Sequence, residues 1–136
     1  MIQPIMTNQA FLAQPSLPAT IEDAQTAQDL ADTLAAHSRE CVGMAANMIG
    51  VHKRIIVFDD AGTSRIMFNP ELLSSAGAYE AEEGCLSLLG RRMTTRYRTI
   101  KVRFEDEGFR VRTRTFTGWT AQIIQHEIDH CNGILI

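Results

Sequence analysis

The chain has 136 residues and a formal net charge of -3, and apolar side chains make up 45% of it. This length suits one domain with one hydrophobic core, so we expect residues 1–136 to form a single domain. The slightly acidic charge gives no reason to expect nucleic-acid binding, and no stretch approaches the ~20 apolar residues of a membrane span. Three cysteines cannot all pair with one another, and no signal peptide is recognisable, so we expect a reducing, cytoplasmic location.

The N-terminal third predicts an arm followed by a helix. Residues 1–19 contain several prolines and little periodicity, which is typical of an extended arm with turns. Thr20 and Asp23 have the spacing of a capping box and predict the start of a helix. Apolar side chains then recur at steps of three and four residues, which predicts an amphipathic helix ending near Arg39.

The middle of the chain alternates small residues with short apolar runs. Cys41–Gly50 is rich in glycine and alanine, which let backbone and ligand approach closely, but alone it indicates only a tight connection. Arg54–Asp59 predicts a buried strand. A second strand is predicted at Arg65–Phe68, ended by Asn69-Pro70, and a weak third strand at Glu71–Ser74.

A hairpin is predicted in the last third. Thr99–Glu105 alternates apolar and charged residues, which predicts a strand with one buried face. After a turn at residues 106–108, Phe109–Phe116 returns as its partner. We expect the arginines of this second strand on its solvent-facing side, as part of a solvated sheet face rather than a polyanion site: Arg110, Arg112 and Arg114.

The C-terminal segment predicts a helix that Thr117 caps and Gly133 ends. It contains His126, Glu127 and His130 in an H-E-x-x-H pattern. Residues four apart lie on one face of a helix, so both imidazoles would be spaced to share one metal ion. Glu127 would lie beside them, as a base toward a metal-bound water. So short a pattern also occurs by chance, and alone it leaves both interpretations open.

The position of the pattern indicates where a third ligand would come from. No His, Asp or Glu follows His130, and the adjacent Cys131 should point about 100° around the helix from it. A third ligand must therefore lie upstream, where the best candidate is Cys85 in the segment EEGCLS. A thiolate and two neutral imidazoles leave a fourth position open, which is typical of a catalytic metal site.

Three segments resemble the signatures of peptide deformylases: EGCLS (Glu83–Ser87), QHEIDH (Gln125–His130) and the Gly-rich CVGMAANMIG (Cys41–Gly50). The resemblance implies the deformylase fold, and the predicted elements agree with it: an α+β fold with antiparallel strands around a C-terminal helix. It also implies a hydrolase of N-terminal processing, which removes the formyl group from formyl-methionine during protein biosynthesis. A divalent metal ion is implied, commonly ferrous iron, with zinc, nickel or cobalt as alternatives.

The resemblance also assigns roles to single residues. Cys85, His126 and His130 correspond to the metal ligands, and Glu127 to the general base and then acid. The backbone N–H of Leu86 corresponds to a donor for the oxyanion of the intermediate. The residues that correspond to substrate-binding positions are Val42 and Gly43 with their backbone groups, Ile123 at the methionine pocket and Arg92 at the peptide backbone. Arg92 is also compatible with a surface arginine, and Asp129 with either an orienting partner of a ligand or a solvent-facing carboxylate.

The chain departs from the family pattern at several positions. Met48 stands where the pattern GxGxAAxQ has a Gln that donates to the oxyanion, and Cys41 stands at the first Gly. Methionine cannot donate a hydrogen bond, so reduced activity is expected unless Asn47 supplies the donor. Leu88-Leu89-Gly90 follows EGCLS where the family usually has a proline.

Other functions stay open at this point. A deformylase-like protein acting on another N-acylated amine is one alternative, and a non-catalytic module that recognises peptide N-termini is another. An H-E-x-x-H endopeptidase is disfavoured because its usual downstream ligand is missing. The expected partner is a formyl-methionyl peptide or nascent chain, with the ribosome as a further candidate and with neither a membrane nor a specific nucleic acid.

Overall fold

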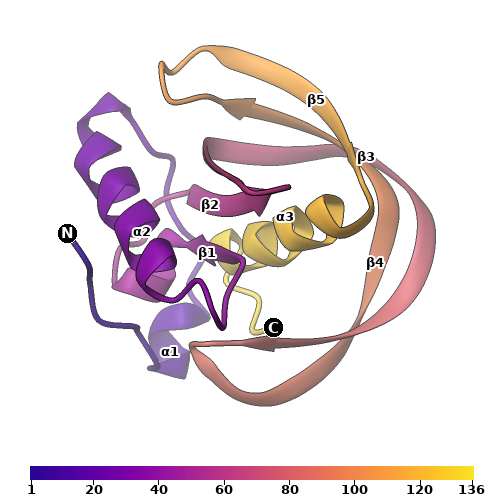
Figure 1. Cartoon of the computed structure of the whole chain (residues 1–136), viewed down its shortest axis with the longest axis horizontal. Helices are drawn as coiled ribbons and strands as arrows, with labels where there is room; N and C mark the ends of the chain where they lie inside the picture. Colours follow the sequence, from indigo (N-terminus) through magenta and orange to yellow (C-terminus); the bar gives the residue numbers. More distant parts are fainter.

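A computed structural model describes residues 1–136. Its strands are β1 (Gly43–Ala45), β2 (Ile55–Asp60), β3 (Thr63–Cys85), β4 (Leu88–Glu105) and β5 (Val111–Thr117). Its helices are α1 (Gln9–Leu12), α2 (Ala24–Ala36) and α3 (Gly118–Cys131), with 3-10 helices η1 (Ile21–Asp23) and η2 (Ala46–Ile49). The strands form one antiparallel sheet in the order β1-β2-β3-β4-β5, which curls around α3 (Figure 1). The predicted α+β class is confirmed, and no helix is long and apolar enough to cross a membrane.

Strand β2 lies between two clusters of buried side chains. Ile56 and Phe58 belong to the cluster that packs against α3. Ile55 and Val57 point the other way and pack with Leu30 and Leu34 of α2. The strand is therefore buried on both faces, as its continuous apolar run predicts. The two clusters replace the single core that the length of the chain suggested.

The capping box at Thr20 is confirmed. The Thr20 backbone N–H donates to the Asp23 carboxylate at 2.8 Å, and the Thr20 hydroxyl accepts from the Glu22 N–H at 3.3 Å. These contacts start η1, which continues into α2. Helix α2 ends at Ala36, before the predicted end at Arg39. The predicted arm also contains the short helix α1, which the sequence reading missed.

The largest difference from the predicted elements is the length of β3 and β4. The predicted strands at residues 65–68 and 71–74 are parts of β3, and β4 begins at Leu88 rather than at Thr99. Cys85 pairs with Leu88 across a tight turn, so β3 and β4 together form one long hairpin. The turn of this hairpin lies at α3, where the Cys85 Sγ comes within 3.4 Å of Nε2 of His130.

The expected break at Asn69-Pro70 is an irregularity inside β3. Pairing with β4 shifts register between Phe68 and Glu71. Asn69 has a φ of +52°, and its side-chain amide exchanges hydrogen bonds of 2.7 and 3.0 Å with the backbone of Ala19. A bulge accommodates a proline without ending the strand. Asn69-Pro70 therefore interrupts the regular pairing, as predicted, but it does not end β3, as the prediction of two separate strands required.

The predicted hairpin of β4 and β5 is confirmed, but two of its arginines lie on the opposite face from the expected one. Arg112 pairs with Phe104, and Arg114 pairs with Val102. Directly opposed side chains share a face of the sheet, so both arginines lie on the same side as the buried Phe116. The Arg114 guanidinium lies 4.9 Å from the Phe116 ring centroid. Both arginines stay exposed at the β5 edge of the sheet.

Helix α3 begins and ends where the sequence predicts. Thr117 is its N-cap, although its side chain makes no capping hydrogen bond, and Asn132 is its C-cap. Gly133 follows with a φ of +74°, and a Cβ there would lie 2.6 Å from the Ala13 carbonyl oxygen. The helix is buried on several sides because the sheet surrounds it; its buried residues are Ala121, Ile123, Ile124, Gln125, His126, Glu127, Ile128, His130 and Cys131.

Candidate metal centre

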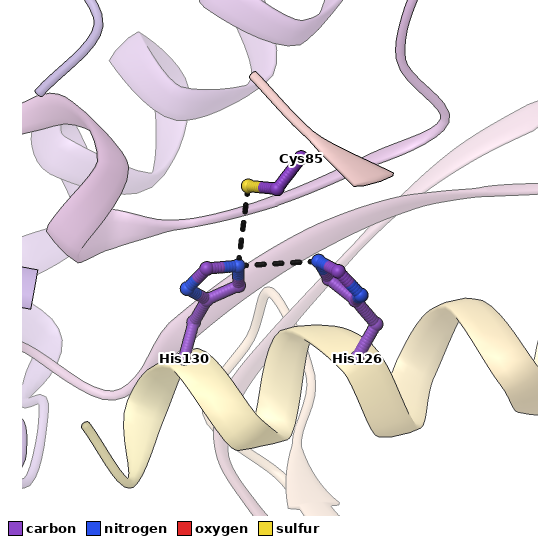
Figure 2. A group of neighbouring side chains, drawn as sticks. All are labelled: Cys85, His126 and His130. Carbon is purple, nitrogen blue, oxygen red and sulfur yellow. Dashed lines mark hydrogen bonds between the residues drawn. The ribbon is translucent and has the colours of Figure 1, made fainter. Parts of the chain in front are cut away.

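Three side chains from two elements converge beside α3 (Figure 2). Cys85 ends β3, while His126 and His130 lie one turn apart on α3. The Cys85 Sγ lies 3.4 Å from Nε2 of His130, which lies 3.2 Å from Nε2 of His126. All three atoms lie within 4.8 Å of one another. One sulfur and two imidazole nitrogens at these separations fit the coordination of a single ion with ligand bonds of ~2.0–2.3 Å.

Glu83 determines which nitrogen of His126 faces the other two ligand atoms. Its Oε1 lies 2.9 Å from Nδ1 of His126. Burial raises the pKa of Glu83, but hydrogen bonds from His126 and Arg96 outweigh burial and hold the pKa at about 2. An ionised carboxylate only accepts hydrogen bonds, so Nδ1 of His126 carries the proton. When His126 binds an ion as a neutral imidazole, Nε2 is therefore the nitrogen that supplies the lone pair.

Arg96 connects Glu83 to a second carboxylate. It is 4% exposed, and its Nη2 lies 2.7 Å from Oε1 of Glu83. Its Nη1 lies 2.7 Å from Oδ2 of Asp129. Of the two roles left open for Asp129, the structure favours a partner in the network around the ligands. The buried guanidinium donates to both carboxylates, so it holds Glu83 and Asp129 in a fixed position relative to one another.

A cavity of about 640 Å³ opens beside the three ligands. Most of the residues predicted for substrate or catalysis line it: Val42, Gly43, Met48, Leu86, Ile123 and Glu127. Arg92 does not line the cavity, whereas its neighbour Arg91 does. Successive side chains of a strand point to opposite faces, so the side chains of Arg91 and Arg92 lie on opposite faces of β4.

Glu127 is buried at the wall of this cavity, with an exposed fraction of 4%. Burial raises the pKa of Glu127 to about 7. A carboxyl group with a pKa near neutrality is suited to both accepting and returning a proton. A Cβ on Gly43 would lie 2.9 Å from Oε2 of Glu127 and 2.7 Å from Cγ2 of Ile123. Because Gly43 has no side chain, Glu127 and Ile123 can pack against its backbone.

Met48 and Asn47 bear directly on the expected oxyanion donor. Met48 is 1% exposed and lines the cavity, as its position in the Gly-rich segment predicts. The Asn47 side-chain nitrogen donates to the His130 carbonyl oxygen at 3.0 Å. That hydrogen bond holds the Asn47 amide donor away from the cavity. Asn47 therefore does not replace the missing donor, and the Leu86 backbone N–H remains the candidate for this role.

Sequence reasoning missed five residues of the site: Glu83, Arg91, Arg96, Trp119 and Gln122. One available signal was the position of Glu83, two residues before Cys85. Side chains two apart on a strand share a face, so a carboxylate on the side of the ligand cysteine was predictable. Arg96 gave no such signal, because the sequence shows it only as one of many arginines.

The comparisons with known proteins identify the family. The model of the polypeptide deformylase family matches residues 2–136. This chain belongs to the peptide deformylase family. A peptide deformylase from Clostridium beijerinckii is 51% identical over 136 residues, with 100% of both chains covered. The crystal structure of a peptide deformylase from Legionella pneumophila is 36% identical with a TM-score of 0.88, covering 99% of this chain and 83% of that one.

A structure that was solved with a bound peptide has the same TM-score at lower sequence identity. The Met-Ala-Ser-bound class I type b peptide deformylase from Acinetobacter baumannii is 28% identical with a TM-score of 0.88, covering 99% of this chain and 97% of that one. The resemblance of the three sequence segments is thus confirmed. The chain is a metal-dependent hydrolase of the deformylase type, and its expected function is to remove the N-formyl group from nascent polypeptides.

The close contact at Gly43 leads to a prediction for this deformylase. Gly43→Ala would place a methyl group where Glu127 and Ile123 now lie. We expect kcat/KM for a formyl-methionyl peptide to fall ~100-fold, because displacements near 1 Å have effects of this size. The measurement is steady-state deformylation, together with a thermal melt to verify folding.

Gly108→Ala is the matched control for Gly43→Ala. Gly108 lies in the turn between β4 and β5, and a Cβ there would come no closer than 3.5 Å to another residue. We expect this control to keep the parent rate. Full activity of Gly43→Ala would show that the carboxyl of Glu127 tolerates displacement, against the role given to it.

Proposed function

We propose that this deformylase holds one ferrous ion between Cys85, His126 and His130, and hydrolyses formyl-methionyl peptides in the adjoining cavity. The observation that carries the proposal is the convergence of three ligand atoms within 4.8 Å at the wall of a cavity. One thiolate and two imidazoles also suit zinc, nickel or cobalt, and the family resemblance favours iron. When bound, such an ion acts as a Lewis acid that polarises a carbonyl oxygen and lowers the pKa of water.

Glu127 moves the proton in this reaction. Its carboxylate accepts a proton from the water molecule that adds to the formyl carbon. As the carbon–nitrogen bond breaks, Glu127 returns that proton to the amine nitrogen, and formate and a free N-terminus are the products. The backbone N–H of Leu86 donates to the oxygen of the tetrahedral intermediate, where negative charge develops. A pKa of about 7 for Glu127 suits both transfers.

The edge of the sheet orients the substrate. β1 is the outermost strand, so one of its sides has no strand partner. The Val42 carbonyl accepts from the Asp59 N–H at 2.8 Å. The Gly43 backbone is offered to an extended peptide, which would compete with the Cys41 thiol for the Gly43 carbonyl, 2.9 Å from Sγ. The methionine side chain lies against Ile123 and Val42 in the cavity. Arg91, which also lines the cavity, interacts with the peptide backbone beyond the methionine.

The expected substrate also indicates the binding partners and the cellular location of the protein. A formyl-methionyl terminus belongs to a polypeptide that has just begun synthesis, so the partner is a nascent chain in the cytoplasm. The ribosome that carries this chain is the second partner of the proposal.

Metal content tests the ligand assignment. Cys85→Ser should lose the ion, while the parent holds one ion per chain. The matched control is the double variant Cys41→Ser and Cys131→Ser, which should keep the ion. Burial raises the pKa of both control thiols to about 12, so neither supplies a thiolate. Loss of metal in the control, or a full complement in Cys85→Ser, would refute the assignment.

A further inference from the structure

Tyr79 and Gln122 are connected to the metal centre without belonging to its ligands. The Tyr79 hydroxyl on β3 donates to Oε1 of Gln122 on α3 at 2.9 Å. Nε2 of Gln122 donates to Oε2 of Glu83 at 2.9 Å. The other oxygen of Glu83 lies 2.9 Å from Nδ1 of His126. A continuous line of hydrogen bonds thus leads from a strand residue to a ligand.

Each hydrogen bond in this line fixes the orientation of the next group. A tyrosine hydroxyl that donates to Oε1 sets which end of the Gln122 amide faces Glu83. With the amide reversed, its oxygen would face the carboxylate and repel it. Arg96 contacts both oxygens of Glu83. Gln122 and His126 each hold a different oxygen, so the carboxylate cannot turn without breaking one of these hydrogen bonds.

We propose that Tyr79 and Gln122 are positioning residues that brace Glu83 and thereby fix the ring of His126 toward the metal. The inference rests on the proposed ligand set. Neither residue lies within the three segments that resemble the family signatures: Tyr79 precedes EGCLS, and Gln122 precedes QHEIDH. The brace connects β3 to α3, the two elements that supply the ligands, so it also fixes their relative position.

The two residues differ in a way that helps the test. Gln122 lines the cavity, so replacing it changes both the brace and the wall that a substrate contacts. Tyr79 does not line the cavity. Its ring lies under the Arg98 guanidinium, 5.1 Å from it, and Phe keeps that contact. Tyr79→Phe therefore removes one hydroxyl from the brace and replaces no side chain of the cavity wall.

The experiment measures release of zinc from loaded protein to a colorimetric chelator. Loss of a partner that orients a metal ligand typically weakens metal binding by roughly 10- to 100-fold. Tyr79 acts one hydrogen bond further out, so we expect Tyr79→Phe to release zinc roughly three- to tenfold faster than the parent. Gln122→Leu should be at least as fast. The double variant should match Gln122→Leu, because both changes break the same line of contacts.

Tyr97→Phe is the matched control. Tyr97 bonds to Gln125 only through its backbone N–H and carbonyl, so removal of its hydroxyl should leave zinc release unchanged. Equal zinc release rates for Tyr79→Phe and Tyr97→Phe would overturn the proposal that Tyr79 positions Glu83. If the parent binds zinc and Cys85→Ser does not, such a result counts against the brace alone. A parent that binds no zinc would overturn the brace together with the ligand set.

Discussion

Glu127→Gln is expected to keep the metal ion and to lower kcat by ~100- to 10,000-fold, the range for loss of a general acid–base group. The amide has nearly the same shape as the carboxyl, so it fits the buried space beside Gly43. It cannot accept a proton from water or return one to the amine. The measurement is formate release under saturating substrate, with metal content determined on the same sample.

Metal retention is what separates this role from a structural one. If Glu127 only supported the fold around His126, the variant would lose metal and activity together. If the variant released formate as fast as the parent, the proton carrier would be another group of the cavity. The expected pattern is a full metal complement with a low kcat.

Met48→Gln is expected to raise kcat/KM for formyl-methionyl peptides by up to ~100- to 1000-fold, the usual contribution of one oxyanion donor. Met48 is buried at the cavity wall and offers no donor, and Asn47 does not line the cavity, because its amide nitrogen donates to the His130 carbonyl. A glutamine at this position would add a second donor to the Leu86 N–H. The gain should appear in kcat, since the oxyanion exists only in the transition state and intermediate.

Met48→Leu is the control, because it changes the side chain without adding a donor. We expect no increase from it. An equal gain in both variants, or a gain confined to KM, would indicate a packing or binding effect instead of a hydrogen bond. A parent rate at the level of relatives that have the glutamine would show that two donors are already present.

Much of the site was predictable because its chemistry depends on local spacing. His126 and His130 lie one turn apart, and a helix with 3.6 residues per turn aligns their side chains whatever surrounds it. Cys85 was predictable as the upstream ligand by elimination and by its segment. The sequence indicated that small residues in the Gly-rich segment permit close approach, but the contact of Gly43 with Glu127 and Ile123 came from the structure.

The long strands were not predictable from local pattern. Asn69-Pro70 is an ordinary stop signal for a strand, and only pairing with β4 across a register shift carries β3 past it. Arg112 and Arg114 alternate like a solvent-facing row, yet their partners across the hairpin place them on the side of Phe116. Register is a tertiary property, and a hydrophobic pattern determines it only where one face is uniformly buried.

The residues that hold the ligands in place through hydrogen bonds were the hardest part of the site to predict from the sequence. Glu83 lies near Cys85 in sequence, but its partners His126, Arg96 and Gln122 come from distant segments. Such contacts leave no periodic signal, since each partner is a single polar residue in an otherwise ordinary strand or helix. The departure at Met48, in contrast, was visible in the sequence, and the structure adds that Asn47 does not compensate for it.

Formate release from formyl-Met-Ala tests the central claim most directly. The protein should be purified without oxygen and loaded with one ferrous ion per chain. Formate should be produced continuously, stop when a chelator removes the ion, and resume when ferrous iron is restored. A protein that carries one ion per chain and produces no formate above that of Cys85→Ser would contradict the account.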